Sequence, residues 1–119
     1  MNEPMKRFIQ RLRTTNATRI TGHLHDIGTE CFCVGGLMCD SYIQETGVGQ
    51  WRRDNTGATY FWLFDDYDSY STVLIDVQNH FGLTSNDIAR CYALNDTDQL
   101  TFPQMADKLE ALLNESANT

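Results

Sequence analysis

The stretch QWRRDNTGATYFWLF, residues 50–64, decides the fold class, because it predicts a β-hairpin in a chain whose other patterns are mostly helical. Residues 55–57 read Asn-Thr-Gly, which is turn chemistry, since Gly57 accepts a positive φ. The flanking residues 50–54 and 58–64 predict two strands. The run Tyr60–Phe64 is apolar on both of its faces. It therefore predicts either burial on both sides or an exposed aromatic patch, and the sequence does not choose between them.

Helical patterns precede the hairpin. A capping Asn2 and a Pro4 in the first turn come before Met5, Phe8, Ile9 and Leu12, whose spacing i, i+3, i+4 and i+7 predicts a first helix. Residues 33–43 are apolar but contain Gly35 and Gly36, each of which weakens a helix by about 1 kcal/mol relative to alanine. We expect a short buried helix here, with the glycines allowing another element to approach closely. Residues 17–25 predict a short strand.

Further helical patterns follow the hairpin. Residues 65–71 predict an acidic loop, residues 73–81 a helix that ends at Gly82, and residues 84–96 a short helical turn. Thr101 and Gln104 form a capping box before an apolar stripe that reaches residue 113. The sequence thus predicts an α+β fold of about four short helices around a small antiparallel hairpin or sheet. We expect residues 1–113 to form one domain with a single core, in which the last helix packs on the first helix and on residues 33–39. We expect residues 114–119 to form a disordered tail.

Composition limits the function classes. The chain has 119 residues and is 41% hydrophobic, which predicts a packed core without disulfides. The formal net charge of −7 is uneven, because residues 60–119 hold ten Asp and Glu against two Lys and Arg. Binding to phosphates requires clustered Lys and Arg, so we do not expect nucleic acid as a partner. The acidic half suits a partner with a basic surface, or serves only to keep the chain in solution.

The location expected from the sequence is cytoplasmic, without a membrane or a cofactor. Lys6 and Arg7 stand where a signal peptide would have its apolar run, and no apolar stretch is long enough to span a bilayer. Three of the four cysteines fall within residues 31–39, a spacing that fits reduced thiols better than disulfides.

One cluster of side chains has the chemistry of a metal site. His23, His25, Cys31 and Cys33 are residue types that bind zinc, but their one-residue gaps are unusual for a zinc site. We expect no metal and keep a zinc-stabilised interaction module as a less favoured alternative. No motif marks a cysteine as a nucleophile, so no catalytic residue is assigned. An enzyme is the less favoured reading, since His, Cys and Asp side chains are present without a spacing that assigns their roles.

The motifs of the chain resemble those of a family of small uncharacterised tailed-phage proteins. The residues that carry the resemblance are Cys33-Val34-Gly35-Gly36-Leu37-Met38-Cys39-Asp40, Trp51, Phe81-Gly82-Leu83, Leu94-Asn95-Asp96 and Phe102 to Leu109. The family typically reads C-C-L-G-V-L-C-D, a tryptophan region, a helix that ends in G-L, and L-N-D-x-x-x-x-F-x-x-I-A-x-x-I. The resemblance spans residues 7–113, and this chain departs from it at Val34 and Gly35. It implies a viral origin and a location in the host cytoplasm, and it implies no mechanism.

Two functions are expected from these observations. The first is non-catalytic binding that inhibits a host protein, for host takeover or anti-defence, since aromatic rings anchor partners while carboxylates steer them. The residues expected to bind the partner are Tyr60, Trp62, Asp65, Asp66, Tyr67, Asp68 and Tyr70. The alternative is a protein that binds or sequesters a small ligand such as a nucleotide signal, with Arg19, Trp51, Arg52 and Arg53 as its site. A homodimer is also open, because the strand over residues 60–64 could complete a sheet across two copies.

Overall fold

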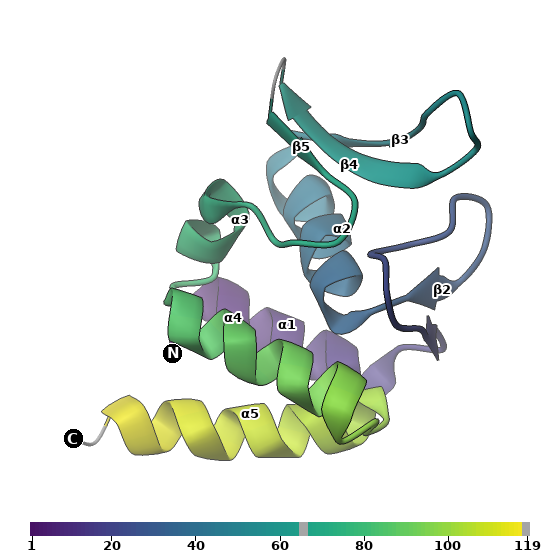
Figure 1. Cartoon of the computed structure of the whole chain (residues 1–119). Coiled ribbons are helices and arrows are strands. Elements are labelled where there is room, and N and C mark those ends of the chain that lie inside the picture. The colour runs from purple at the N-terminus through teal and green to yellow at the C-terminus, as the bar shows by residue number, and fades with distance from the viewer. Residues whose placement is uncertain (65–66, 118–119) are drawn as a thin grey trace.

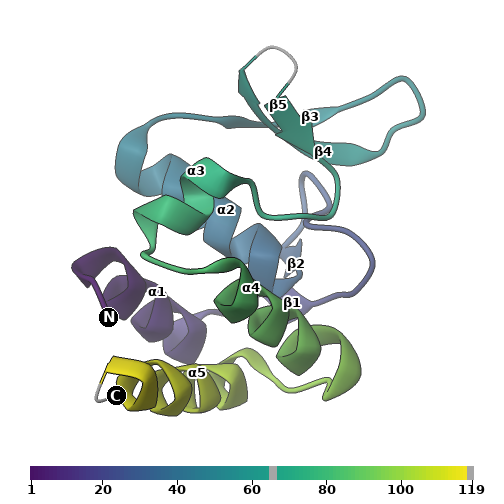
Figure 2. The same cartoon turned by 60° about the vertical axis from the view of Figure 1, so that its left-hand side comes forward.

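A layer of helices supports a small sheet in the computed structural model, which describes residues 1–64 and 67–117 (Figure 1). Helices α1, α4 and α5 pack side by side at one end, α2 and α3 lie in the middle, and the sheet β3–β4–β5 lies at the other end (Figures 1 and 2). The bounds are α1 Glu3–Thr14, β1 Thr18–Arg19, β2 Cys31–Phe32, α2 Val34–Thr46, β3 Gln50–Arg53, β4 Thr59–Phe64, β5 Tyr67–Ser69, α3 Ile75–His80, α4 Ser85–Tyr92, the π-helical turn η1 Ala93–Thr97, and α5 Phe102–Ala117. The predicted α+β class is confirmed, with five α-helices in the described residues instead of about four.

The predicted hairpin is confirmed as β3 and β4, which pair antiparallel with Trp51 opposite Phe61. Gly57 has a φ of 87°, as its place in the turn requires. The expected loop over residues 65–71 is wrong for residues 67–69, which form β5 on the other edge of β4, whereas residues 70 and 71 lie outside the strands and helices as expected. A hairpin partner overrides the low strand propensity of an acidic segment, because the ladder satisfies its backbone groups. Asp65 and Asp66 lie outside the described residues.

The strand expected over residues 17–25 is mostly wrong. Only Thr18 and Arg19 form a strand, which pairs in parallel with β2. His25 makes an isolated bridge to Phe32. Between these two places the chain turns at Gly22, whose φ is 87°, and a positive φ interrupts the extended backbone of a strand.

Helix α1 forms as its sequence predicts. The side chain of Asn2 caps it by accepting a hydrogen bond from the Met5 amide at 2.9 Å. Its apolar stripe is fully buried and consists of Met5, Phe8, Ile9 and Leu12. The stripe contacts α5, which begins at the predicted capping box of Thr101 and Gln104. The expected packing of the last helix on the first is therefore confirmed, and α5 itself runs to Ala117, beyond the expected end at residue 113.

Helix α2 is the central element of the core. The side chain of Cys33 caps it, with Sγ accepting from the Gly36 amide at 3.3 Å. A Cβ on Gly36 would collide with the carbonyl of Leu24, so the predicted close approach at a helical glycine is confirmed. Helix α2 contacts α3 and α4, and its Asp40 and Glu45 form ion pairs with Arg11 and Arg7 of α1. Helix α4 lies between α5 and α2 in Figure 2, and the expected packing of the last helix on residues 33–39 stays a prediction, although Cys33, Leu37 and Leu109 belong to the same core.

Helices α3 and α4 follow the sheet. Helix α3 begins at Ile75 and not at residue 73, because Leu74 is extended, with a ψ of 154°, and occupies the capping position. Helix α4 has a complete capping box, in which Thr84 and Asp87 each bond the other's backbone amide. The short helical turn predicted over residues 84–96 is therefore confirmed and is continued by η1. Within the described residues, no helix is both long enough and apolar enough to cross a bilayer.

Candidate functional site

The strand β4 divides its side chains between two faces of the sheet. Phe61 and Leu63 are buried against the helices, whereas Tyr60 and Trp62 are half-buried and Phe64 is 51% exposed on the opposite side. Side chains alternate along a strand, so β4 has one covered face and one open face. We call the open side the outer face. Its residues, taken from the strand register and the ring contacts, are Gln50, Arg52, Tyr60, Trp62, Phe64, Asp68 and Tyr70.

The side chains of the outer face are held in pairs. The Arg52 guanidinium lies 3.7 Å from the centre of a Trp62 ring, and the Tyr60 and Tyr70 ring centroids are 5.3 Å apart. At one end of β4, the Phe64 and Tyr67 rings are stacked with centroids 4.9 Å apart. Such contacts contribute about 0.5–1 kcal/mol each at exposed sites. They fix the orientation of the rings and leave much of their surface in contact with solvent.

Carboxylates border the outer face. The Tyr70 hydroxyl donates to Asp54 Oδ2 at 2.8 Å, and Asp68 is exposed on β5. Hydrogen bonds to its carboxylate, from the Thr56 side chain first and then from Tyr70, lower the pKa of Asp54 to about 2. Asp54 is thus ionised across the physiological range. Of the expected partner-binding residues, the structure brings together Tyr60 and Trp62 on β4, Tyr67 and Asp68 on β5, and Tyr70 directly after β5.

The four residues of the alternative ligand site do not converge. The Arg19 guanidinium donates to the Asn95 carbonyl at 2.8 Å, beside η1. On β3, Trp51 Nε1 donates to Asp40 at 3.0 Å and Arg53 donates to the Ile27 carbonyl at 2.9 Å, while Arg52 lies over Trp62 on the outer face. Alternation along β3 puts neighbouring side chains on opposite faces. Arg52 and Arg19 are therefore apart from the Trp51 ring, and only Arg53 shares its face of the sheet.

The His and Cys cluster is used in local structure. His23 Nε2 lies 2.7 Å from Asp26, and the buried His25 ring is stacked on Phe32, with Nδ1 2.8 Å from the Cys31 carbonyl. Cys33 caps α2, and Cys31 is half-buried. In the part of the chain that the structure describes, no group of three or more His, Cys, Asp or Glu side chains could hold a metal ion.

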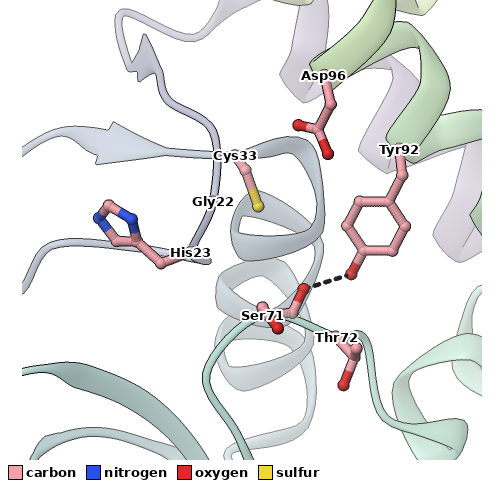
Figure 3. Close-up of a pocket in the computed structure, with 7 residues that line it drawn as sticks. All are labelled: Gly22, His23, Cys33, Ser71, Thr72, Tyr92 and Asp96. Carbon is pink, nitrogen blue, oxygen red and sulfur yellow. Dashed lines mark hydrogen bonds between the residues drawn. The ribbon is translucent and has the colours of Figure 1, made fainter.

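A pocket of about 270 Å³ lies over the N-terminus of α2 (Figure 3). We call it the α2 pocket. It is lined by Gly22, His23, Cys33, Ser71, Thr72, Tyr92 and Asp96. Its residues come from the segment between β1 and β2, the N-cap of α2, the segment after β5, the end of α4 and η1. The sequence singled out Cys33 and Asp96 only as parts of two separate motifs, and nothing in their spacing indicates that they line one pocket.

Asn95 connects the two sides of the α2 pocket. This residue is fully buried, and its side-chain oxygen accepts from the Val34 amide at 3.0 Å, at the first turn of α2. Its side-chain nitrogen donates to the Ile20 carbonyl at 2.9 Å and to Asp96 Oδ1 at 2.7 Å. One asparagine therefore ties α2, the segment after β1 and η1 together, and it orients the Asp96 carboxylate.

The thiol in the α2 pocket is poorly suited to nucleophilic catalysis. Burial raises the pKa of Cys33, and the nearby Asp96 carboxylate raises it further, against the lowering effect of the Gly36 and Gly35 amides. A reactive cysteine needs a lowered pKa, since the thiolate is the nucleophile. The imidazole of His23 also turns away from Cys33 (Figure 3). The pocket is better suited to binding than to chemistry on the sulfur.

Comparisons with known proteins find no protein that is significantly similar to this chain. A scan against protein-family models finds no match, and neither the curated proteins nor the solved structures give a significant one.

Proposed function

We propose that this chain is a small phage-encoded accessory protein that acts without catalysis, by binding a host protein and inhibiting it. The observation that carries the proposal is the outer face, where Phe64 and Tyr70 are 51% and 43% exposed and Trp62 is half-buried, although the alternate side chains of β4 are buried. Single apolar side chains on a surface are ordinary, whereas a contiguous group of them is typical of a binding site. The viral origin and the host rest on the sequence resemblance alone.

The residue types of the outer face are those that dominate binding energy. Trp, Tyr and Arg are enriched among the residues whose truncation weakens interfaces most. Here Arg52 is held over Trp62 and also donates to the Gln50 side chain at 3.1 Å, while Tyr70 is held by Asp54. Ordering these side chains in advance lowers the entropy cost of association. The outer face is therefore a pre-organised set of anchors.

The charges around these anchors favour a basic partner. Asp54 and Asp68 accompany the rings, with Arg52 as the one cation among the outer-face residues. The C-terminal half of the chain adds a net negative charge. Complementary charge mainly raises the rate of association and is screened by salt. We therefore expect capture of the partner to be faster at low salt than at high salt.

The test compares tagged variants of the chain in a bacterial host lysate, with bound proteins quantified by mass spectrometry. Trp62→Ala/Phe64→Ala removes two accessible side chains from the outer face. The matched control is Val48→Ala/Ile75→Ala, which removes two apolar side chains that are 45% and 49% exposed elsewhere. A true partner is held by the wild type and the control and is lost by the outer-face variant.

Two results would count against the proposal. One is that no protein is held above background at low salt. The other is that both double variants lose the same bound proteins equally, which would mean that exposed apolar side chains capture these proteins non-specifically. Inhibition is then checked by adding the purified chain to an activity assay of the captured protein.

A further inference from the structure

We propose that the α2 pocket binds a small organic cation, namely the alkylammonium or alkylguanidinium group that also ends a lysine or arginine side chain. The inference uses residues outside the outer face, so it stands or falls separately from the proposed function.

The shape of the α2 pocket limits what it can hold. Its volume of about 270 Å³ is below the range of roughly 300–1,000 Å³ that is typical of pockets for drug-sized ligands. A nucleotide would overfill it, whereas the end of one long side chain fits. Figure 3 shows that Cys33, Tyr92 and Asp96 point toward a common space, with Ser71 on the opposite side.

The charge of the lining favours a cation. Asp96 is the one carboxylate among the lining residues, and none of these residues is Lys or Arg. The only basic side chain in the lining is His23, and its Nε2 lies 2.7 Å from Asp26 instead of facing Asp96. Asn95 donates to Oδ1 of Asp96, which holds the carboxylate in place and leaves Oδ2 to accept from a ligand. A hydrogen bond between two charged groups is roughly twice as strong as one between neutral groups.

Further acceptors complete the polar side of the pocket. The Ser71 carbonyl accepts from the Tyr92 hydroxyl at 2.9 Å and has a second lone pair, as does the hydroxyl oxygen of Tyr92. An ammonium carries three donors and a guanidinium five, so acceptors on two sides of the space suit either group. The Tyr92 ring offers an aromatic surface to the alkyl chain.

An anion is disfavoured although the pocket lies at a helix N-terminus. Free amides at such an end normally attract anions. Here the Val34 amide donates to Asn95 and the Gly36 amide donates to Cys33, so the first turn of α2 is already capped by the chain itself. An incoming anion would also meet the Asp96 carboxylate.

The experiment is an amide NMR titration of the whole chain at neutral pH with three probes. These are n-butylammonium, N-acetyl-lysine N-methylamide and propionate, the last as an anion of similar size. We expect saturable shifts at the amides of Gly22, Ser71, Thr72 and Asp96 with n-butylammonium, and none with propionate. If the blocked lysine also binds, the cation comes from a protein side chain. If it fails while n-butylammonium binds, the pocket takes free amines.

The matched variants are Asp96→Asn and Asp98→Asn. The first keeps an oxygen to accept from Asn95 but loses the charge, and the second neutralises an exposed carboxylate outside the lining. Asp96→Asn should weaken n-butylammonium binding about tenfold or more, which corresponds to about 1.4 kcal/mol, while Asp98→Asn should leave it within twofold or so. Unchanged amide spectra away from the pocket would show that both variants fold. The proposal is overturned if no cation gives saturable shifts at the pocket amides, or if both variants weaken binding equally.

Discussion

The helix α5 and the strand β4 are both rich in apolar residues, but they differ in how much of their apolar side chains is buried. On α5, the stripe of Phe102, Met105 and Leu109 is entirely buried. On β4, only every second side chain is buried, and Phe64 at its end is half exposed. Helix α5 packs on α1 and lies beside α4, whereas β4 has helices on one side only. The number of apolar residues in a segment therefore does not tell whether the segment lies in the core or on a binding surface. What distinguishes the two cases is how many faces of the helix or strand other elements cover.

The largest effect that tests this comparison is the loss of core stability in Leu109→Ala. Leu109 is 2% exposed, and truncating a fully buried leucine costs about 2–5 kcal/mol of unfolding free energy. A typical domain has about 5–15 kcal/mol in total, so this variant should be barely folded. Trp62→Ala removes a larger side chain from the outer face but should cost only about 1 kcal/mol, mainly its contact with Arg52. Chemical denaturation of both variants gives the two values.

Equal losses of unfolding free energy in Leu109→Ala and Trp62→Ala would contradict the distinction between a buried α5 stripe and an open face of β4. They would mean that Trp62 belongs to the core in solution, and the outer face would then be unavailable to a partner.

The next largest effect concerns the close packing under α2. Gly36→Ala forces a Cβ against the Leu24 carbonyl, which is backbone and cannot rotate away. We expect a cost of about 1–3 kcal/mol, the usual range for overpacking. Gly35→Ala is the matched control, because its Cβ would meet the Tyr92 hydroxyl and a Val73 methyl, both 3.0 Å away and both on side chains that can shift. Thermal unfolding should rank Gly36→Ala clearly below Gly35→Ala, and the reverse order would contradict the structure.

The parts of the fold that the sequence predicts are those defined by local chemistry. The hairpin depends on Gly57 in a tight turn, and α5 depends on a cap at Thr101 followed by a regular stripe. The sequence does not predict β5, because its pairing with β4 decides it. The amide of Leu24 donates to the Tyr70 carbonyl just after β5, a contact that no pattern around residue 70 reveals.

The candidate site divides in the same way. The sequence singles out the aromatic residues of the outer face because they fall in one continuous acidic segment, residues 60–70. The α2 pocket was not predicted as a site, since its residues come from segments far apart in the chain. Cys33 and Asp96 line the same pocket, where the buried Asn95 next to Asp96 bonds both the first turn of α2 and the segment after β1. Hydrogen bonds between segments far apart in the chain produce no periodic pattern in the sequence, so sequence patterns do not predict this pocket.

The smallest predicted effect is electrostatic and lies at the edge of the outer face, in the hairpin turn. Hydrogen bonds lower the pKa of Asp54 from its ordinary value of 3.8 to about 2. A carboxyl group whose pKa is lower in the folded state stabilises the fold above its unfolded pKa. Asp54 should thus contribute fully above about pH 4, and its contribution should disappear as the pH falls through about 2. The carboxyl carbon of Asp54, followed by NMR over this range, should titrate near pH 2.

Two variants assign the cause of this shift. Thr56→Val removes the hydroxyl that donates to Asp54 Oδ1 at 2.6 Å, and Tyr70→Phe removes the one that donates to Oδ2 at 2.8 Å. Both should raise the pKa of Asp54, and Thr56→Val should raise it more, because the Thr56 hydrogen bond is the largest cause. If Tyr70→Phe leaves the pKa unchanged, then Tyr70 is not held by Asp54 in solution. Its ring would be free to rotate away from Tyr60, and the outer face would lose one of its fixed anchors.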